Sequence, residues 1–191
     1  MKLLAFIVLI LTAGCGPVII LDVPPAEERA QQNKVWLEAL RATARPGDWL
    51  VIRGYKAVDN LVVAATNIPL SHAAVYDQKG DQVIEAVGEG VRATSLEAFV
   101  DHAHRVLLIR PRWWTPERGD EAAAFAQGAV GDGYDFLGTV GAGTAGRYYC
   151  SELCVEAYRA HHVDKDHLPR VMEPGQMFLW GQVLHDTGPR Y

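Results

Sequence analysis

The sequence predicts an α+β domain in which an antiparallel sheet packs against the helix that carries Cys150. Two β-rich runs, at 72–76 and 82–87, are separated by a polar turn cluster, which is the pattern of an antiparallel hairpin. A third run at 49–52 has the composition of a buried strand. The stretch at 151–161 instead places its apolar residues on one face of a helix.

The elements before the hairpin follow from local patterns. Residues 26–44 have apolar side chains at helical spacing, and the Arg-Pro-Gly-Asp sequence at 45–48 ends that helix ahead of the strand at 49–52. Residues 54–69 mix helix and loop signals, so the sequence assigns them no element.

The elements after the hairpin alternate between helix and strand. In chain order we expect a short helix that a capping box at 94–97 opens and that runs through Val100, a strand at 105–110 ended by Pro111, an alanine-rich helix at 116–130, a glycine-rich loop at 131–146, and the helix at 151–161. The segment after Pro169 shows no decisive pattern.

The N-terminus has the layout of a bacterial targeting segment. Lys2 precedes an apolar run at 3–11, well short of the roughly 20 residues that a membrane-spanning helix needs. Residues 12–15 then resemble a lipobox, with Cys15 as the lipidated residue. The alternative, a membrane anchor continuing through 18–21, would be broken by Pro17. We therefore expect a signal peptide at 1–14, a lipidated tether at 15–25 and a single domain at 26–191.

Composition limits the partners. With 191 residues, 49% of them hydrophobic, the chain is long enough for one well-filled core. The formal charge of −5 and the lack of a long basic run argue against nucleic-acid binding. An acidic body needs the lipid on Cys15 to stay at an anionic membrane. We expect a lipid-anchored protein of the bacterial cell envelope, on the periplasmic side of the outer membrane in a Gram-negative host.

Three residues have the chemistry of a cysteine nucleophile, its base and the group that orients the base. Cys150 starts a helix, where unpaired N–H groups and the helix dipole favour a thiolate. His72 opens the first hairpin strand, and Glu85 interrupts the apolar second strand, where a buried carboxylate needs a partner. Pairing Tyr76 with Asp81 or Gln82 would place His72 opposite Glu85 or its neighbour. The blander alternative is that Cys150 is a small buried apolar residue.

Two other motifs match known binding-site patterns but lack the structural context that those sites need. Gly141–Gly146 fits G-x-G-x-x-G, but neither the preceding strand of a βαβ unit nor a helix opening inside the motif accompanies it. Cys150, Cys154 and His161 share a helical face, yet about 16 Å of helix separates the first from the last, too far for one zinc ion. We expect no metal and no organic cofactor, and we interpret Cys154 as an ordinary core residue.

These residues resemble a known family. The sequence at 71–76 around His72, the strand around Glu85 and the segment Tyr149–Leu153 are similar to the YiiX/YebB-like branch of the NlpC-type papain-like cysteine hydrolases, a circularly permuted group in which histidine precedes cysteine. The resemblance covers roughly residues 45–159 and implies a papain-like fold. It also implies Cys150 as nucleophile, His72 as base, Glu85 as orienter and Tyr134 near the oxyanion.

The expected activity is cleavage of an amide bond, as in peptides, through an acyl-enzyme on Cys150. Two alternatives stay open. The wider family suggests an acyl hydrolase or acyltransferase acting on lipids, for which Trp113–Trp114 and Phe178–Trp180 are candidates to line an apolar groove. The other alternative is a non-catalytic binding module of the same fold.

Overall fold

The computed structural model describes residues 20–162 and 167–190. The predicted signal peptide, Cys15 and the first part of the tether therefore lie outside the described residues. Within the described part of the chain, no helix is both long enough and apolar enough to span a bilayer.

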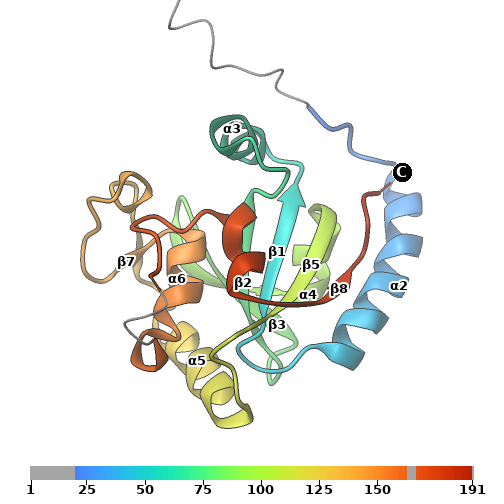
Figure 1. Ribbon diagram of the computed structural model, residues 1–191. Helices are drawn as coiled ribbons and strands as arrows, with labels where there is room; N and C mark the ends of the chain where they lie inside the picture. The colour runs from blue at the N-terminus through green and yellow to red at the C-terminus, as the bar shows by residue number, and fades with distance from the viewer. Residues whose placement is uncertain (1–19, 163–166, 191) are drawn as a thin grey trace, which may run out of the picture.

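A six-stranded antiparallel sheet forms the centre of the molecule (Figure 1). Its strands, in spatial order, are β4 (Gly90–Ser95), β3 (Gln82–Val87), β2 (His72–Asp77), β1 (Trp49–Gly54), β5 (Ala103–Pro111) and β8 (Gly181–Asp186). The hairpin and the strands at 49–52 and 105–110 are confirmed, whereas β4 and β8 are additions that the sequence did not predict.

Helices cover both faces of the sheet, because the central strands are apolar on both sides. Trp49 and Val51 of β1 face a core shared with α5 (Pro116–Gly128) and α6 (Cys150–Glu156), while Leu50 and Ile52 face a second core shared with α2 (Ala26–Thr43) and α4 (Leu96–Asp101). Figure 1 shows α5 and α6 on the side of the sheet away from α2. The predicted α+β class is therefore correct.

Shorter elements complete the chain. They are α3 (Ala57–Thr66), in the segment that the sequence left unassigned, the small parallel pair β6 (Gly133–Tyr134) and β7 (Arg147–Tyr148), and the 3-10 turns η1 (Gly138–Val140), η2 (Arg159–His161) and η4 (Pro174–Trp180).

Two predicted helices differ from the observed ones. The helix expected at 151–161 ends at Glu156, and a 3-10 turn follows it, because the Tyr158 N–H bonds to Val155 in a tighter turn and its hydroxyl donates to the buried Gly47 carbonyl (3.0 Å). The capping box expected to begin at Thr94 is not formed. Ser95 caps α4 instead, its Oγ accepting from the Ala98 N–H (3.2 Å), and Thr94 belongs to β4.

The predicted hairpin register is wrong. Tyr76 pairs with Val83, not with Asp81 or Gln82, and Asp77 pairs with Gln82. Asp81 has a left-handed backbone (φ 47°), and its N–H closes the turn onto the Gln78 carbonyl (3.2 Å), so it belongs to the turn and not to the ladder. Continuing the observed register places Glu85 opposite Ala74, two residues along the same face from His72.

Candidate functional site

Cys150 begins α6, which packs on the β2 and β3 side of the sheet. Its side chain is buried, and burial raises the pKa of the thiol. A hydrogen bond with His72 and the positive charge of that ring, together with the backbone N–H groups of Ala73 and Ser151, outweigh burial, so the net pKa lies below its ordinary value. The surroundings of Cys150 therefore favour the thiolate, the reactive form of the side chain.

His72 joins the thiol to a buried carboxylate. Its Nε2 donates to Oε2 of Glu85 (2.6 Å), which leaves Nδ1 as the ring nitrogen for Cys150. Although the register is not the expected one, a diagonal neighbour on the same sheet face is within reach of a long side chain. Burial lowers the pKa of His72, but the hydrogen bonds to Cys150 and Glu85 and their charges raise it to about 10.

Glu85 is held by three side chains at once. Besides His72, the Arg92 Nε donates to its Oε1 (3.0 Å), and so does the Thr94 Oγ1 (2.6 Å). Glu85 is only 4% exposed, and burial raises its pKa, yet the partners lower the pKa to about 2. The carboxylate therefore stays charged and fixes both the orientation and the tautomer of the imidazole ring. The sequence analysis missed Arg92 and Thr94, because both belong to the unpredicted β4.

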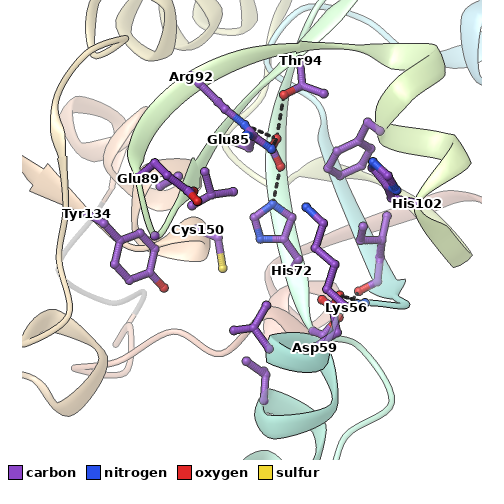
Figure 2. A pocket seen from close by; sticks show the side chains of 18 of the residues that line it. Lys56, Asp59, His72, Glu85, Glu89, Arg92, Thr94, His102, Tyr134 and Cys150 are labelled. Carbon is purple, nitrogen blue, oxygen red and sulfur yellow. Dashed lines mark hydrogen bonds and ion pairs between the residues drawn. The ribbon is translucent and has the colours of Figure 1, made fainter. Parts of the chain in front are cut away.

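The three side chains reach the site from opposite faces of the sheet. The His72 ring lies against Phe99 of α4 (ring centroids 6.0 Å), whereas α6 packs beside β2 on the face that it shares with α5. They meet at the end of β2, in a pocket of about 450 Å³. Figure 2 shows Cys150 beside His72, with Glu85 bound to the far side of the ring.

Tyr134 lies in the same pocket as Cys150 (Figure 2). Burial raises its pKa, and so does the nearby negative charge of the Cys150 thiolate, so the hydroxyl keeps its proton and can donate it to a hydrogen bond. The structure thus brings together all four residues that the sequence selected for the site.

A buried carboxylate next to Tyr134 organises the glycine-rich loop. Asp135 accepts hydrogen bonds from the backbone N–H groups of Gly138 (2.8 Å) and Thr144 (2.7 Å). A Cβ on Gly138 would lie 2.7 Å from the Asp135 carboxylate, so the loop can close there only on a glycine. Of the three glycines in the G-x-G-x-x-G pattern, Gly143 lies against the Asp135 carboxylate, whereas Gly141 and Gly146 have left-handed backbones (φ 81° and 72°).

Several sequence candidates lie elsewhere. Cys154 is fully buried one turn along α6, and His161 pairs with Glu121 (2.9 Å) on the surface. Trp113 is buried in the core, and neither it nor the segment 178–180 lines the pocket of Cys150. The proposed apolar groove of these aromatic residues is therefore not part of this site.

Comparison with known proteins gives a family match over most of the chain. Residues 45–177 match a family model described as "Permuted papain-like amidase enzyme, YaeF/YiiX, C92 family". The curated "Probable lipoprotein peptidase YaeF" of Escherichia coli strain K12 is 29% identical over 97 residues, which are 50% of this chain and 35% of that protein. The chain thus spans about a third of the length of that relative.

Among solved structures, the chain is similar to yiiX from Escherichia coli O157:H7, with a TM-score of 0.52 and 24% identity over 61% of this chain and 66% of that one. That structure is described as a metalloprotein. Within the described residues of the present chain, no group of three or more His, Cys, Asp or Glu side chains is arranged to hold a metal ion. At 24% identity, the likeness to yiiX bears on the fold alone.

Proposed function

Because the chain belongs to the permuted papain-like amidase family, we propose that it is a cell-envelope cysteine hydrolase that cleaves an amide bond through an acyl-enzyme on Cys150. The observation that carries the proposal is the position of His72, whose Nε2 donates to Glu85 (2.6 Å) and whose ring lies beside the Cys150 thiol in the same pocket. This arrangement supplies a thiolate, a proton donor and a fixed orientation for that donor in one pocket.

The chemistry follows from the positions of the atoms. The Cys150 sulfur attacks the carbonyl carbon, and the oxyanion forms near the Tyr134 hydroxyl and the N–H at the start of α6. His72 gives its proton to the leaving nitrogen as the C–N bond breaks. Water then attacks the thioester, returning a proton to His72 and releasing the acid. Glu85 stabilises the imidazolium before acylation and again after water attacks, and it stays ionised at every step, in keeping with its lowered pKa.

Trapping the acyl-enzyme tests this proposal. A panel of peptide amides is mixed with the protein at mildly acidic pH, the reaction is quenched within seconds, and intact-mass and peptide mass spectrometry locate the acyl group. We expect a thioester on Cys150 and none in Cys150→Ala. Turnover without any adduct on Cys150, or an unchanged turnover in Cys150→Ala, contradicts the mechanism.

A lipid-directed acyl hydrolase is the second candidate, and one observation favours it. Two exposed apolar side chains line the pocket from different elements: Val58 on α3 and Phe136 after β6. Such a rim suits an acyl chain or a membrane surface. Hydrolysis of phospholipid esters in vesicles at a higher kcat/KM than any peptide amide would favour this candidate over the first.

The proposed cell-envelope location depends on the segment ahead of the described residues. Its support is the lipobox-like sequence ending at Cys15 and the name of the relative, a lipoprotein peptidase. Mass spectrometry of the mature N-terminus from a bacterial membrane fraction tests it. Diacylglyceryl-modified Cys15 is the expected species, and an intact Met1 or an unmodified Cys15 contradicts the expectation.

A further inference from the structure

The pocket contains a cation that the proposed chemistry does not use. Lys56, immediately before α3, lines the pocket together with His72 and His102. Among the described residues, no oxygen accepts a hydrogen bond from its ammonium group. A lysine side chain brings three N–H donors and a positive charge, and all of them remain available to a ligand.

The backbone of Lys56 is held in a fixed position relative to His72. The Asp59 carboxylate accepts hydrogen bonds from the Lys56 backbone N–H (2.8 Å) and from the Ser71 hydroxyl (2.6 Å). Asp59 and Ser71 are both buried, and Ser71 directly precedes His72. The start of the Lys56 side chain is therefore anchored through two buried side chains to the residue beside the base.

Gly54 makes room for this anchor. A Cβ at that position would lie 2.3 Å from the Asp59 carboxylate, and the Gly54 N–H donates to the Ser71 hydroxyl (3.0 Å). The local sequence thus fixes the backbone at the start of α3, while the Lys56 side chain is exposed at the pocket.

The position of Lys56 relative to His72 determines which part of a bound substrate Lys56 contacts. The Tyr55 N–H donates to the His102 carbonyl (3.3 Å), which joins the start of α3 to the end of α4, and α4 also provides the Phe99 ring that contacts His72. In the view of Figure 2, Cys150 and Tyr134 lie on one side of His72, and Lys56 and His102 lie on the other.

This order assigns the two halves of an amide substrate. The acyl carbon must bond to the Cys150 sulfur, with its oxygen toward Tyr134. The leaving nitrogen must receive its proton from His72, so the amine half extends past the ring toward Lys56. A carboxylate is the substituent that an unpaired ammonium binds most strongly in such a place.

We propose that Lys56 binds a carboxylate on the leaving amine, so that the pocket selects amides whose amine product is an amino acid with a free carboxylate. This inference rests on the proposed amidase function. The C–N bond breaks as the Cys150 sulfur bonds to the acyl carbon, the His72 proton passes to the nitrogen, and the amino acid leaves with its carboxylate paired to Lys56. Water then hydrolyses the thioester.

A labelling experiment tests the charge preference without any substrate. Iodoacetate carries a carboxylate and iodoacetamide does not, and both alkylate the Cys150 thiolate. The ratio of their rate constants, iodoacetate over iodoacetamide, should fall about threefold in Lys56→Met. Lys79→Met, which removes an exposed lysine in the turn between β2 and β3, is the matched control and should leave the ratio unchanged. An equal ratio in wild type and Lys56→Met overturns the inference.

A matched substrate pair tests selection during turnover. N-acyl amino acids are compared with the same compounds carrying a C-terminal carboxamide. Wild type should prefer the free carboxylate by about tenfold in kcat/KM, mainly through KM, and Lys56→Met should lose that preference, whereas Lys79→Met should keep it. If wild type hydrolyses both compounds with no preference, the proposed role of Lys56 is refuted and the proposed amidase function stands. If wild type hydrolyses neither, the proposed function fails, while the alkylation ratio still reports on the charge of the pocket.

Discussion

The two cysteines of α6 are one turn apart, and their surroundings make them chemically different. Cys150 is 8% exposed and Cys154 is 0% exposed, so burial does not distinguish them. Cys150 faces His72 and backbone N–H groups, whereas Cys154 lies within the apolar core that contains Trp49 and Leu153. The difference between them therefore comes from the partners of each thiol.

The pKa directions express this contrast. Burial raises the pKa of Cys154, and the nearby charge of Cys150 raises it further, so Cys154 remains a thiol. Burial also raises the pKa of Cys150, but His72 reverses the effect. A buried cysteine becomes a nucleophile here only because a cationic ring is held against it, and Cys150 itself and Glu85 together raise the pKa of His72 and keep that ring cationic.

The largest expected effect is the loss of turnover on substitution of Cys150 or His72. Cys150→Ser and His72→Ala should each reduce turnover by about 10³-fold or more while keeping the wild-type melting temperature within a few degrees. Because the two residues act as a unit, the double variant should lose no more than either single one. Steady-state kinetics and thermal melts provide the measurement, and losses that add up in the double variant would break the proposed pairing.

Alkylation compares the two thiols directly. Iodoacetamide should modify Cys150 about 10²-fold faster than Cys154 in the native protein, because only Cys150 has a thiolate-stabilising partner. Peptide mass spectrometry of a time course reads both rates. The difference should collapse in His72→Ala, and a persistent difference in that variant would mean that access rather than charge separates the two cysteines.

Glu85→Gln should have a smaller effect, with a distinctive pH signature. The amide can still orient the ring but stabilises its cation poorly, so turnover should fall by about 10- to 100-fold. In wild type, activity falls at low pH as the thiolate gains a proton and at high pH as the imidazolium loses one, near its raised pKa of about 10. Without the carboxylate the pKa of His72 falls, so the alkaline limb of kcat/KM against pH should move to lower pH. An unmoved limb would assign Glu85 a purely structural role.

Much of the fold could be predicted from local patterns. The hairpin, the helix at 26–43 and the buried strands each carry their own periodicity, and the order of motifs around His72, Glu85 and Cys150 led to the permuted papain-like fold, which the family match and the likeness to yiiX confirm. The edge strands β4 and β8 could not be predicted in this way. They carry several polar residues and become strands only through pairing with β3 and β5.

Some residues of the site could also be predicted from local sequence patterns, and others could not. Cys150, His72 and Glu85 could be selected because each is a reactive or charged residue in an apolar or helix-start context, although their catalytic roles stay predictions. Arg92 and Thr94 could not, because their contact with Glu85 depends on the register of β4 against β3. The hairpin register was missed for a related reason: nothing local indicates that Asp81 adopts a left-handed conformation.

The smallest expected effect concerns Cys154, whose carbonyl accepts a hydrogen bond from Trp49 Nε1 (3.2 Å) while its thiol only fills space in the core. Cys154→Ala keeps that carbonyl and removes one buried sulfur atom, so unfolding should become easier by about 1 kcal/mol and turnover should stay within about twofold of wild type. Chemical denaturation and kinetics on the same preparation measure both. A stability loss of this size with unchanged turnover per folded molecule would sharpen the contrast with Cys150. A large loss of turnover in a well-folded Cys154→Ala protein would instead show that the second turn of α6 takes part in positioning the nucleophile, and the separation between the two thiols would no longer hold.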